Sequence, residues 1–223
     1  MLHFLQEAMR NIRATGSVIP SSPALAAAMT RVISEHNGCK RVLEVGAGTG
    51  AFTGAILHTL DAGDVFDIVE LNPSFCAHLE SKLLRPFRAR QPSASARVHQ
   101  SAIEDSQLTN NYDFIVCGLP FNNFPLPLTE SIFAQMLDLL HPGGVLSFFE
   151  YIGVRAVKRP FADRAQRDAM NGLEAFQARM ARAHSVRREM VMANIPPATA
   201  VHITKAEKSP STASPCSAST KTI

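Results

Sequence analysis

Three glycines separated by single residues form the strongest candidate for a binding loop in this 223-residue sequence. Gly46, Gly48 and Gly50 follow the apolar run RVLEV (41–45) and precede a segment with helical spacing that starts near Phe52. Glycine permits a tight turn and lets a ligand approach the backbone, and the start of a helix offers free amides. The GxGxG spacing differs from the GxGxxG of dinucleotide loops, and the GK[ST] of a P-loop is absent. The segment is therefore predicted to bind a ligand of another kind.

Two acids accompany this loop. Glu70 ends the second predicted strand, VFDIVEL (65–71), and lies 20 residues after Gly50. An acid at this strand end can accept hydrogen bonds from both hydroxyls of a ribose. Glu44 precedes the loop, where it either orients the loop, contacts an amine of the ligand, or is a buried acid satisfied by backbone amides. The pattern predicts a ligand that contains a ribose.

Strand and helix patterns alternate along the chain, and this alternation decides where the candidate residues lie. An alternation of this kind predicts a parallel sheet covered on both faces, and a closing strand pair around Pro196-Pro197 adds one antiparallel strand at the edge. The expected fold class is α/β, a Rossmann-like three-layer sandwich with a mostly parallel seven-stranded sheet. The predicted strands are 41–45, 65–71, 96–100, 112–118, 145–152, 186–195 and 199–205, and the main helices are 52–60, 73–84, 128–140 and 160–183.

The ends of the chain differ from this middle part. Residues 2–14 have an apolar face of helical period, with Arg10 and Arg13 off that face, so residues 1–22 are expected to be an amphipathic helix and a linker. Ser22 is expected to cap the next helix, with Pro23 at its first position. The domain should span 23–205, and the Ser-, Thr- and Pro-rich segment 206–223 is predicted to be a disordered tail.

Composition excludes several classes of protein. The net charge of +3 is too small to indicate nucleic acid binding, and the four cysteines show no CxxC pair, so neither a disulfide scaffold nor a metal site is expected. No segment is apolar enough to span a membrane, and the first residues lack the features of a secretion signal, which predicts an intracellular protein. Basic segments flank a middle part that has acids but no Lys or Arg over 98–154. Such segments favour phosphate-bearing partners, although a solvated helix face has the same composition.

The glycine loop and its acids resemble motif I of the class I S-adenosylmethionine-dependent methyltransferases. That resemblance implies S-adenosyl-L-methionine as the cofactor, with the loop around its methionine part and Glu70 on its ribose. Residues after the third strand would flank the adenine, although Glu104 and Asp105 could equally cap a helical turn. The implied cofactor-binding residues are Glu44, Gly46, Ala47, Gly48, Gly50, Glu70, Leu71, Ala102, Ile103 and Gly118.

A second motif follows the fourth strand, where the chain reads GLPF (118–121). In rRNA adenine dimethyltransferases this loop reads [ND]-[LP]-P-[YFW], and its first side chain accepts a hydrogen bond from the target amine. Here Gly118 has no such acceptor, so backbone carbonyls would have to serve. GLPF instead resembles the bacterial phospholipid N-methyltransferases, as do the N-terminal segment with its PSS (20–22), VELNPSF (69–75) and NIPPA (194–198). The resemblance covers roughly residues 4–205.

The resemblance implies an N-methyltransferase that acts on the amine headgroup of phosphatidylethanolamine or a related amino lipid. Its catalytic residues would be Tyr151, Gly118, Leu119 and Pro120, while Glu150 would bind the ammonium group or pair with one of the arginines that follow it, as part of the structure. Phe121 and Phe124 would contact methylated ammonium groups or close the pocket with an apolar wall. Arg10, Arg13 and Arg155 would contact an anionic membrane surface. The protein would be cytoplasmic, bound peripherally to the inner membrane, with no metal and no nucleic acid partner.

Two other functions remain open at this stage. A nucleic-acid adenine methyltransferase is compatible with the basic segments, but Gly118 and the lack of an extra RNA-binding domain count against it. A membrane-surface protein that kept the cofactor pocket but lost turnover is disfavoured by the intact glycine loop and Glu70.

Overall fold

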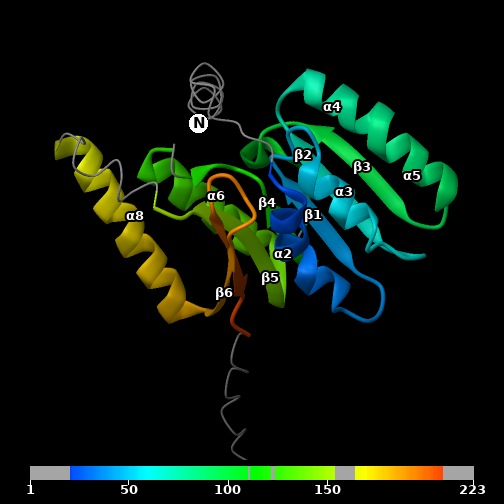
Figure 1. Ribbon diagram of the computed structural model, residues 1–223. Helices are drawn as coiled ribbons and strands as arrows, with labels where there is room; N and C mark the ends of the chain where they lie inside the picture. The colour runs from blue at the N-terminus through cyan, green and yellow to red at the C-terminus, as the bar shows by residue number, and fades with distance from the viewer. Residues whose placement is uncertain (1–20, 110, 122–123, 154–163, 208–223) are drawn as a thin grey trace, which may run out of the picture.

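A computed structural model describes residues 21–109, 111–121, 124–153 and 164–207 (Figure 1). Its seven strands form one sheet in the order β3-β2-β1-β4-β5-β7-β6. The first five strands are parallel, and β7 runs antiparallel to both of its neighbours, β5 and β6. The predicted fold class is confirmed, but the antiparallel strand is not at the edge as predicted: β7 lies between β5 and the edge strand β6. The strands are β1 (Arg41–Val45), β2 (Val65–Glu70), β3 (Ser95–Gln100), β4 (Tyr112–Cys117), β5 (Leu140–Tyr151), β6 (Ser185–Val191) and β7 (Ala198–Thr204).

Helices cover both faces of this sheet, because successive side chains of each strand point to opposite faces. Val42 of β1 packs with the helices of one face, and its neighbour Leu43 packs with those of the other. The first face carries α2 (Pro23–Ser34), α3 (Ala51–Leu57), α4 (Pro73–Leu79), the π-helical turn Glu80–Leu84 and α5 (Arg85–Arg90); the second carries α6 (Leu126–Leu139) and α8 (Arg164–Ala183). Two hydrophobic cores therefore lie on either side of a buried sheet.

Local sequence explains where the helices begin. The Ser22 hydroxyl accepts a hydrogen bond from the Leu25 amide at 3.2 Å, with Pro23 at the first position of α2 as predicted. Asn72 caps α4 in the same way through the Ser74 amide. Both caps satisfy amides that a helix start leaves without partners.

Two element boundaries differ from the prediction. The helix expected to end at residue 84 continues through a π-helical turn to Arg90, where Phe87 is buried and the Arg88 guanidinium pairs with Glu80 at 2.8 Å. The strand expected from residue 145 starts at Leu140, because the HPGG segment pairs with the end of β7. The Gly143 amide donates to the Lys205 carbonyl, and the Lys205 amide donates to the Gly144 carbonyl.

Some predicted features lie outside the described residues. These are the amphipathic helix over 2–14, the first residues of the helix expected from 160, and most of the tail after 206. Within the described part of the chain, no helix combines the length and apolar character needed to cross a membrane.

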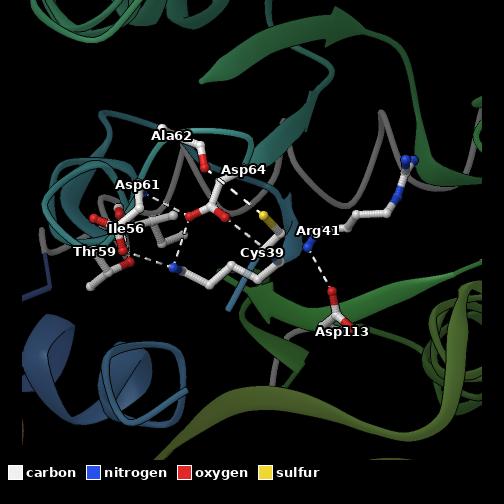
Figure 2. A network of polar contacts seen from close by, with 9 residues as sticks. Cys39, Arg41, Ile56, Thr59, Asp61, Ala62, Asp64 and Asp113 are labelled. Carbon is white, nitrogen blue, oxygen red and sulfur yellow. Dashed lines mark hydrogen bonds and ion pairs between the residues drawn. The ribbon is translucent and has the colours of Figure 1, made fainter. Parts of the chain in front are cut away.

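A buried ion pair fixes the amino-terminal ends of β1 and β2 (Figure 2). The Lys40 ammonium group lies 2.7 Å from the Asp64 carboxylate, and both side chains are almost fully buried. The same carboxylate accepts the backbone amides of Lys40 and Asp61 at 2.9 and 2.8 Å. Since a buried charge is costly unless it is paired and hydrogen-bonded, this network holds the turn before β2 in place. It lies at the end of the sheet opposite the glycine loop.

Candidate functional site

The sheet order places two loops beside each other at the carboxyl ends of β1 and β4. The strand order reverses between β1 and β4: β2 and β3 are added on one side of β1, and β4 and β5 on the other. Crevices at such a switch point are the usual ligand sites of open α/β sheets. The Gly118 amide donates to the Val45 carbonyl at 2.8 Å, and the Gly46 amide donates to the Val69 carbonyl at 2.9 Å. The glycine loop and the GLPF loop are also in direct contact, at the Gly46 carbonyl and Gly118.

The glycine loop is tightly packed at its start and open in its middle. All three glycines have positive φ, at +73° for Gly46, +56° for Gly48 and +89° for Gly50. A Cβ added to Gly46 would lie 2.4 Å from a methyl carbon of Leu119, whereas one added to Gly48 would meet nothing within 4 Å. Glycine is thus needed at position 46 for space as well as conformation. The open backbone at Gly48 is the part that a ligand can approach.

Glu70 connects the second strand to this loop. One carboxylate oxygen accepts the Gly48 amide at 2.9 Å, and the other accepts the Asn72 amide at 2.8 Å. The side chain is only 2% exposed. Each carboxylate oxygen can accept more than one hydrogen bond, so both remain available to hydroxyls of a ligand. Glu70 therefore positions the loop in addition to the ribose role predicted for it.

Glu44 is fully buried directly beneath the loop. The Thr53 hydroxyl donates to one of its oxygens at 2.6 Å, while the other oxygen has no hydrogen-bond partner among the described residues. Burial raises the pKa of Glu44 to about 8, against the opposing effect of the Thr53 hydrogen bond. Of the alternatives predicted for Glu44, the structure shows the buried acid, with Thr53 as its hydrogen-bond partner. Its free oxygen can accept a hydrogen bond from an amine or carry a proton.

The segment after β3 presents a residue that the sequence did not single out as a ligand. Ala102 and Ile103 are each 1% exposed and pack in the core, and the Gln135 amide of α6 donates to the Ile103 carbonyl. Both carboxylate oxygens of Glu104 are buried without a hydrogen-bond partner among the described residues. A buried carboxylate without partners is costly, which makes Glu104 a candidate acceptor for a donor group of a ligand. The sequence offered two equal interpretations of this acid and no way to choose.

Gly118 is required by the contact between the two loops. A Cβ at this position would lie 2.5 Å from the carbonyl oxygen of Gly46 and 3.6 Å from the Phe52 ring. The acidic or amide side chain found here in the adenine methyltransferases has no room in this arrangement. Acceptors for an amine at this place are thus confined to the backbone carbonyls of the loop.

Replacing Gly118 with alanine is expected to lower cofactor affinity by about tenfold, because one of the two loops must shift to relieve the overlap and overpacking costs about 1–3 kcal/mol. Calorimetric titration with S-adenosylmethionine measures this change. Gly54→Ala is the matched control, since a Cβ at Gly54 of α3 meets nothing within 4 Å. Equal affinity of both variants would show that the loop contact does not matter for binding.

Tyr151 and Glu150 point to opposite faces of the sheet, as strand alternation predicted. The Tyr151 ring packs edge-to-face on Phe149, with centroids 5.3 Å apart, and Phe149 packs on Phe52 directly after the glycine loop. Burial raises the pKa of the Tyr151 phenol, so it keeps its proton at neutral pH. Tyr151 can therefore exchange hydrogen bonds with an amine, but it is not a ready proton acceptor.

Glu150 lies on the α8 side of the sheet. Its carboxylate accepts a hydrogen bond from Gln177 and lies 3.8 Å from the Arg188 guanidinium. It lines a pocket together with Phe121, Phe133, Phe148, Leu173 and Phe176. Of the two roles predicted for Glu150, the contact with Arg188 favours pairing with an arginine, although the pocket it lines is largely aromatic.

The two phenylalanines of the GLPF region are parts of the core. Phe121 and Phe124 are 6% and 8% exposed, and their rings meet edge-to-face at 6.0 Å. Phe121 also packs on Phe133 and Phe148. This packing favours the prediction that they form an apolar wall over the prediction that they contact a methylated ammonium group.

The remaining predicted site residues are buried or half-buried near the two loops, or they lie outside the described residues. Ala47 and Leu119 are buried beside the loop, Leu71 is half-buried at the edge of the core, and Pro120 is half-buried. Arg10, Arg13 and Arg155 lie outside the described residues. Within the described ranges, no group of three or more His, Cys, Asp or Glu side chains is suited to hold a metal ion.

The described residues fit a ligand that joins a nucleoside to an amino acid with a charged amine. Two features carry this fit: the partner-free oxygen of Glu44 beneath the loop and the open backbone at Gly48. The cofactor would be held between Glu70, the glycine loop and the segment at Glu104. When bound, S-adenosyl-L-methionine supplies a methyl group on a positively charged sulfur.

Comparison with known proteins agrees with this arrangement. Residues 43–146, just under half of the chain, match a family described as a methyltransferase domain. The chain is 28% identical over 149 residues to an ornithine lipid N-methyltransferase of Singulisphaera acidiphila, a match that covers 65% of this chain and 74% of that protein. It is also 32% identical over 126 residues to a highly reducing polyketide synthase of Pyricularia oryzae, but that match spans 4% of the synthase.

Solved structures share the fold at low sequence identity. The O-methyltransferase TomG of Streptomyces achromogenes, in complex with SAM, has a TM-score of 0.59 at 17% identity, over 91% of this chain and 89% of TomG. An O-methyltransferase of Bacillus cereus, in complex with SAH, has a TM-score of 0.58 at 15% identity, over 91% of each chain. The domain match and these neighbours support S-adenosyl-L-methionine as the cofactor, as predicted from the glycine loop. The chain therefore has the Rossmann-like fold of the class I methyltransferases, and the loops that form its candidate site lie in a region that matches a methyltransferase domain.

Proposed function

We propose that this protein is an S-adenosylmethionine-dependent N-methyltransferase that acts on the amine headgroup of a membrane lipid. The observation that carries the proposal is the similarity to an ornithine lipid N-methyltransferase, which extends over three quarters of that protein's length. The GLPF loop at the carboxyl end of β4 supports it, because Gly118 leaves backbone carbonyls as the acceptors for the amine. Phosphatidylethanolamine and ornithine-type lipids both carry the primary amine that this site would take.

The chemistry requires a neutral amine held in line with the methyl group. The neutral amine has two N–H groups, and we assign their acceptors to the carbonyls of Gly118, Leu119 and Pro120, which would thereby orient the nitrogen lone pair. Tyr151 contributes its hydroxyl from the end of β5. Because the pKa of its phenol is raised, Tyr151 keeps its own proton, and the ammonium form gives its proton to solvent water before the transfer. The phenylalanine cluster around Phe121 excludes water from one side.

Replacing Tyr151 with phenylalanine is expected to lower turnover on lipid by about 10- to 100-fold while cofactor affinity stays the same. The ring contact with Phe149 is retained, so the hydroxyl alone is removed. Tyr112→Phe is the matched control, since that hydroxyl donates to Asp67 inside the core. It should lower stability without lowering turnover of the folded protein. Full activity of Tyr151→Phe would remove this residue from the site.

The proposed function is tested by incubating the protein with S-adenosylmethionine labelled in its methyl group and separate vesicles of phosphatidylethanolamine or ornithine lipid. Thin-layer chromatography then shows whether label moves with a methylated lipid, and which headgroup accepts it. No lipid label from a protein that binds the cofactor would contradict a lipid substrate. Label in added RNA would favour the adenine methyltransferase.

A further inference from the structure

An unusual group of exposed apolar side chains lies at one corner of the sheet. Among the described residues, four large apolar side chains are exposed, and all four belong to β6, the β6–β7 turn or the residue after β5. We call them the apolar corner: Ile152, Met190, Met192 and Ile195, which are 38%, 74%, 69% and 78% exposed. Single exposed apolar residues are common on proteins, but their gathering in one place marks an interaction surface.

The apolar corner adjoins the candidate site. Both Tyr151 of β5 and Val191 of β6 pair with Ala198, so the β6–β7 turn lies level with the carboxyl end of β5. The Ile152 amide donates to the Pro197 carbonyl of the turn at 2.8 Å. Because β4 and β7 are the two neighbours of β5, the strands that lead to the GLPF loop and to this turn are about 10 Å apart across the sheet at ordinary strand spacing. Figure 1 shows the turn as the orange loop at the upper end of the sheet.

The turn is held in shape by a buried asparagine. Asn194 is 2% exposed; its side-chain oxygen accepts the Ser22 amide at 2.8 Å, and its side-chain nitrogen donates to the Pro196 carbonyl at 2.8 Å. Its polar group is thus satisfied inside the protein, while Met192 and Ile195 on either side of it face outward. An apolar surface on a fixed turn pays little conformational entropy when it is covered.

The charge pattern around the turn suits a lipid surface. No Asp, Glu, Lys, Arg or His occurs from Met190 to Val201, so covering the turn removes no charge from water. Arg188, two residues before Met190 on the same face of β6, lies 3.8 Å from Glu150 and still has a side chain that is 45% exposed. At a membrane surface the apolar side chains would enter the hydrocarbon, and the arginine would lie at the level of the anionic headgroups.

We propose that the apolar corner inserts into the bilayer surface and places the candidate site at the level of the lipid headgroups. This inference rests on the proposed function, since it assumes that the substrate amine is presented by a membrane. It adds a docking surface on the methyltransferase domain itself, separate from the amphipathic segment expected near the N-terminus. The partner is a lipid surface, and the contact is made by side chains of the β6–β7 turn.

The test is sedimentation of the full chain with vesicles of phosphatidylethanolamine and phosphatidylglycerol. The double variant Met192→Ser/Ile195→Ser should bind these vesicles about 10- to 100-fold more weakly than the wild type, because two apolar side chains lose most of their transfer free energy. The matched control, Met192→Leu/Ile195→Leu, keeps the apolar character and should bind as the wild type does. Cofactor affinity of both variants should be unchanged, which shows that they fold.

The outcomes separate this inference from the proposed function. If the wild type methylates vesicle lipid and the serine variant sediments and methylates equally well, the inference is wrong and the function stands. If the serine variant loses vesicle binding but no variant transfers methyl groups to lipid, the docking surface stands and the function is wrong. If the serine variant instead converts a dimer to a monomer in analytical ultracentrifugation, the corner is an interface between two copies and the inference is overturned.

Discussion

Replacing Glu70 with alanine is expected to reduce affinity for S-adenosylmethionine by a hundredfold or more. The variant loses the acceptor predicted for the ribose hydroxyls and also the hydrogen bond that holds the Gly48 amide. Hydrogen bonds to a charged group contribute about 1.5–3 kcal/mol each, and every 1.4 kcal/mol is a factor of ten in affinity. Calorimetric titration of the variant measures the loss directly.

Two further variants make this result specific. Glu70→Gln keeps the size of the side chain but replaces one acceptor oxygen with a donor group, so an intermediate loss is expected. Glu189→Ala removes an acid that pairs with Arg31 on the surface, far from the loop, and should bind the cofactor normally. Wild-type affinity in Glu70→Ala would contradict the assignment of Glu70 to the cofactor.

Replacing Asp64 with alanine is expected to lower the free energy of unfolding by about 3–5 kcal/mol, because the Lys40 charge is then left buried without its main partner. Asp61, 3.6 Å from the ammonium group and largely exposed, compensates for little of this loss. The two backbone amides that Asp64 accepts also lose their acceptor. Urea unfolding followed by circular dichroism measures the change.

A double replacement separates the cost of an unpaired charge from the value of the pair. Lys40→Met/Asp64→Leu removes both charges, so it should be clearly more stable than Asp64→Ala, since an apolar pair of similar size often substitutes for a buried ion pair. A loss below about 1 kcal/mol in Asp64→Ala would mean that Lys40 reaches solvent when its partner is removed.

The sequence predicted the sheet and the positions of the two loops after their strands because those features depend on short local patterns. The run RVLEV before alternating glycines and the acid at the end of VFDIVEL both describe single elements whose neighbours follow from the parallel order. The roles of Glu104 and Glu150 were not predictable in this way. Each role depends on which distant side chains come near the acid. Glu104 has no hydrogen-bond partner in the described part of the chain, whereas Glu150 lies near Arg188.

The predicted start of β5 was wrong because long-range backbone pairing outweighed the local turn composition. The HPGG segment has the composition of a turn, yet Lys205, far along the chain, provides its backbone partners and draws it into β5. The apolar corner was not predicted either. Met and Ile next to strands are usually core residues, and only the edge position of β6 shows that these are exposed.

The contact between Gly46 and Gly118 has a consequence for altering what this protein methylates. Because the carbonyl of one glycine occupies the space that a side chain on the other would need, the two loops cannot be diversified independently. A library meant to change the acceptor should hold both glycines constant and vary Pro120, which is half-buried. A functional variant with a substitution at position 118 would also need a compensating shift of the glycine loop. Acceptor preference and cofactor affinity would therefore change together.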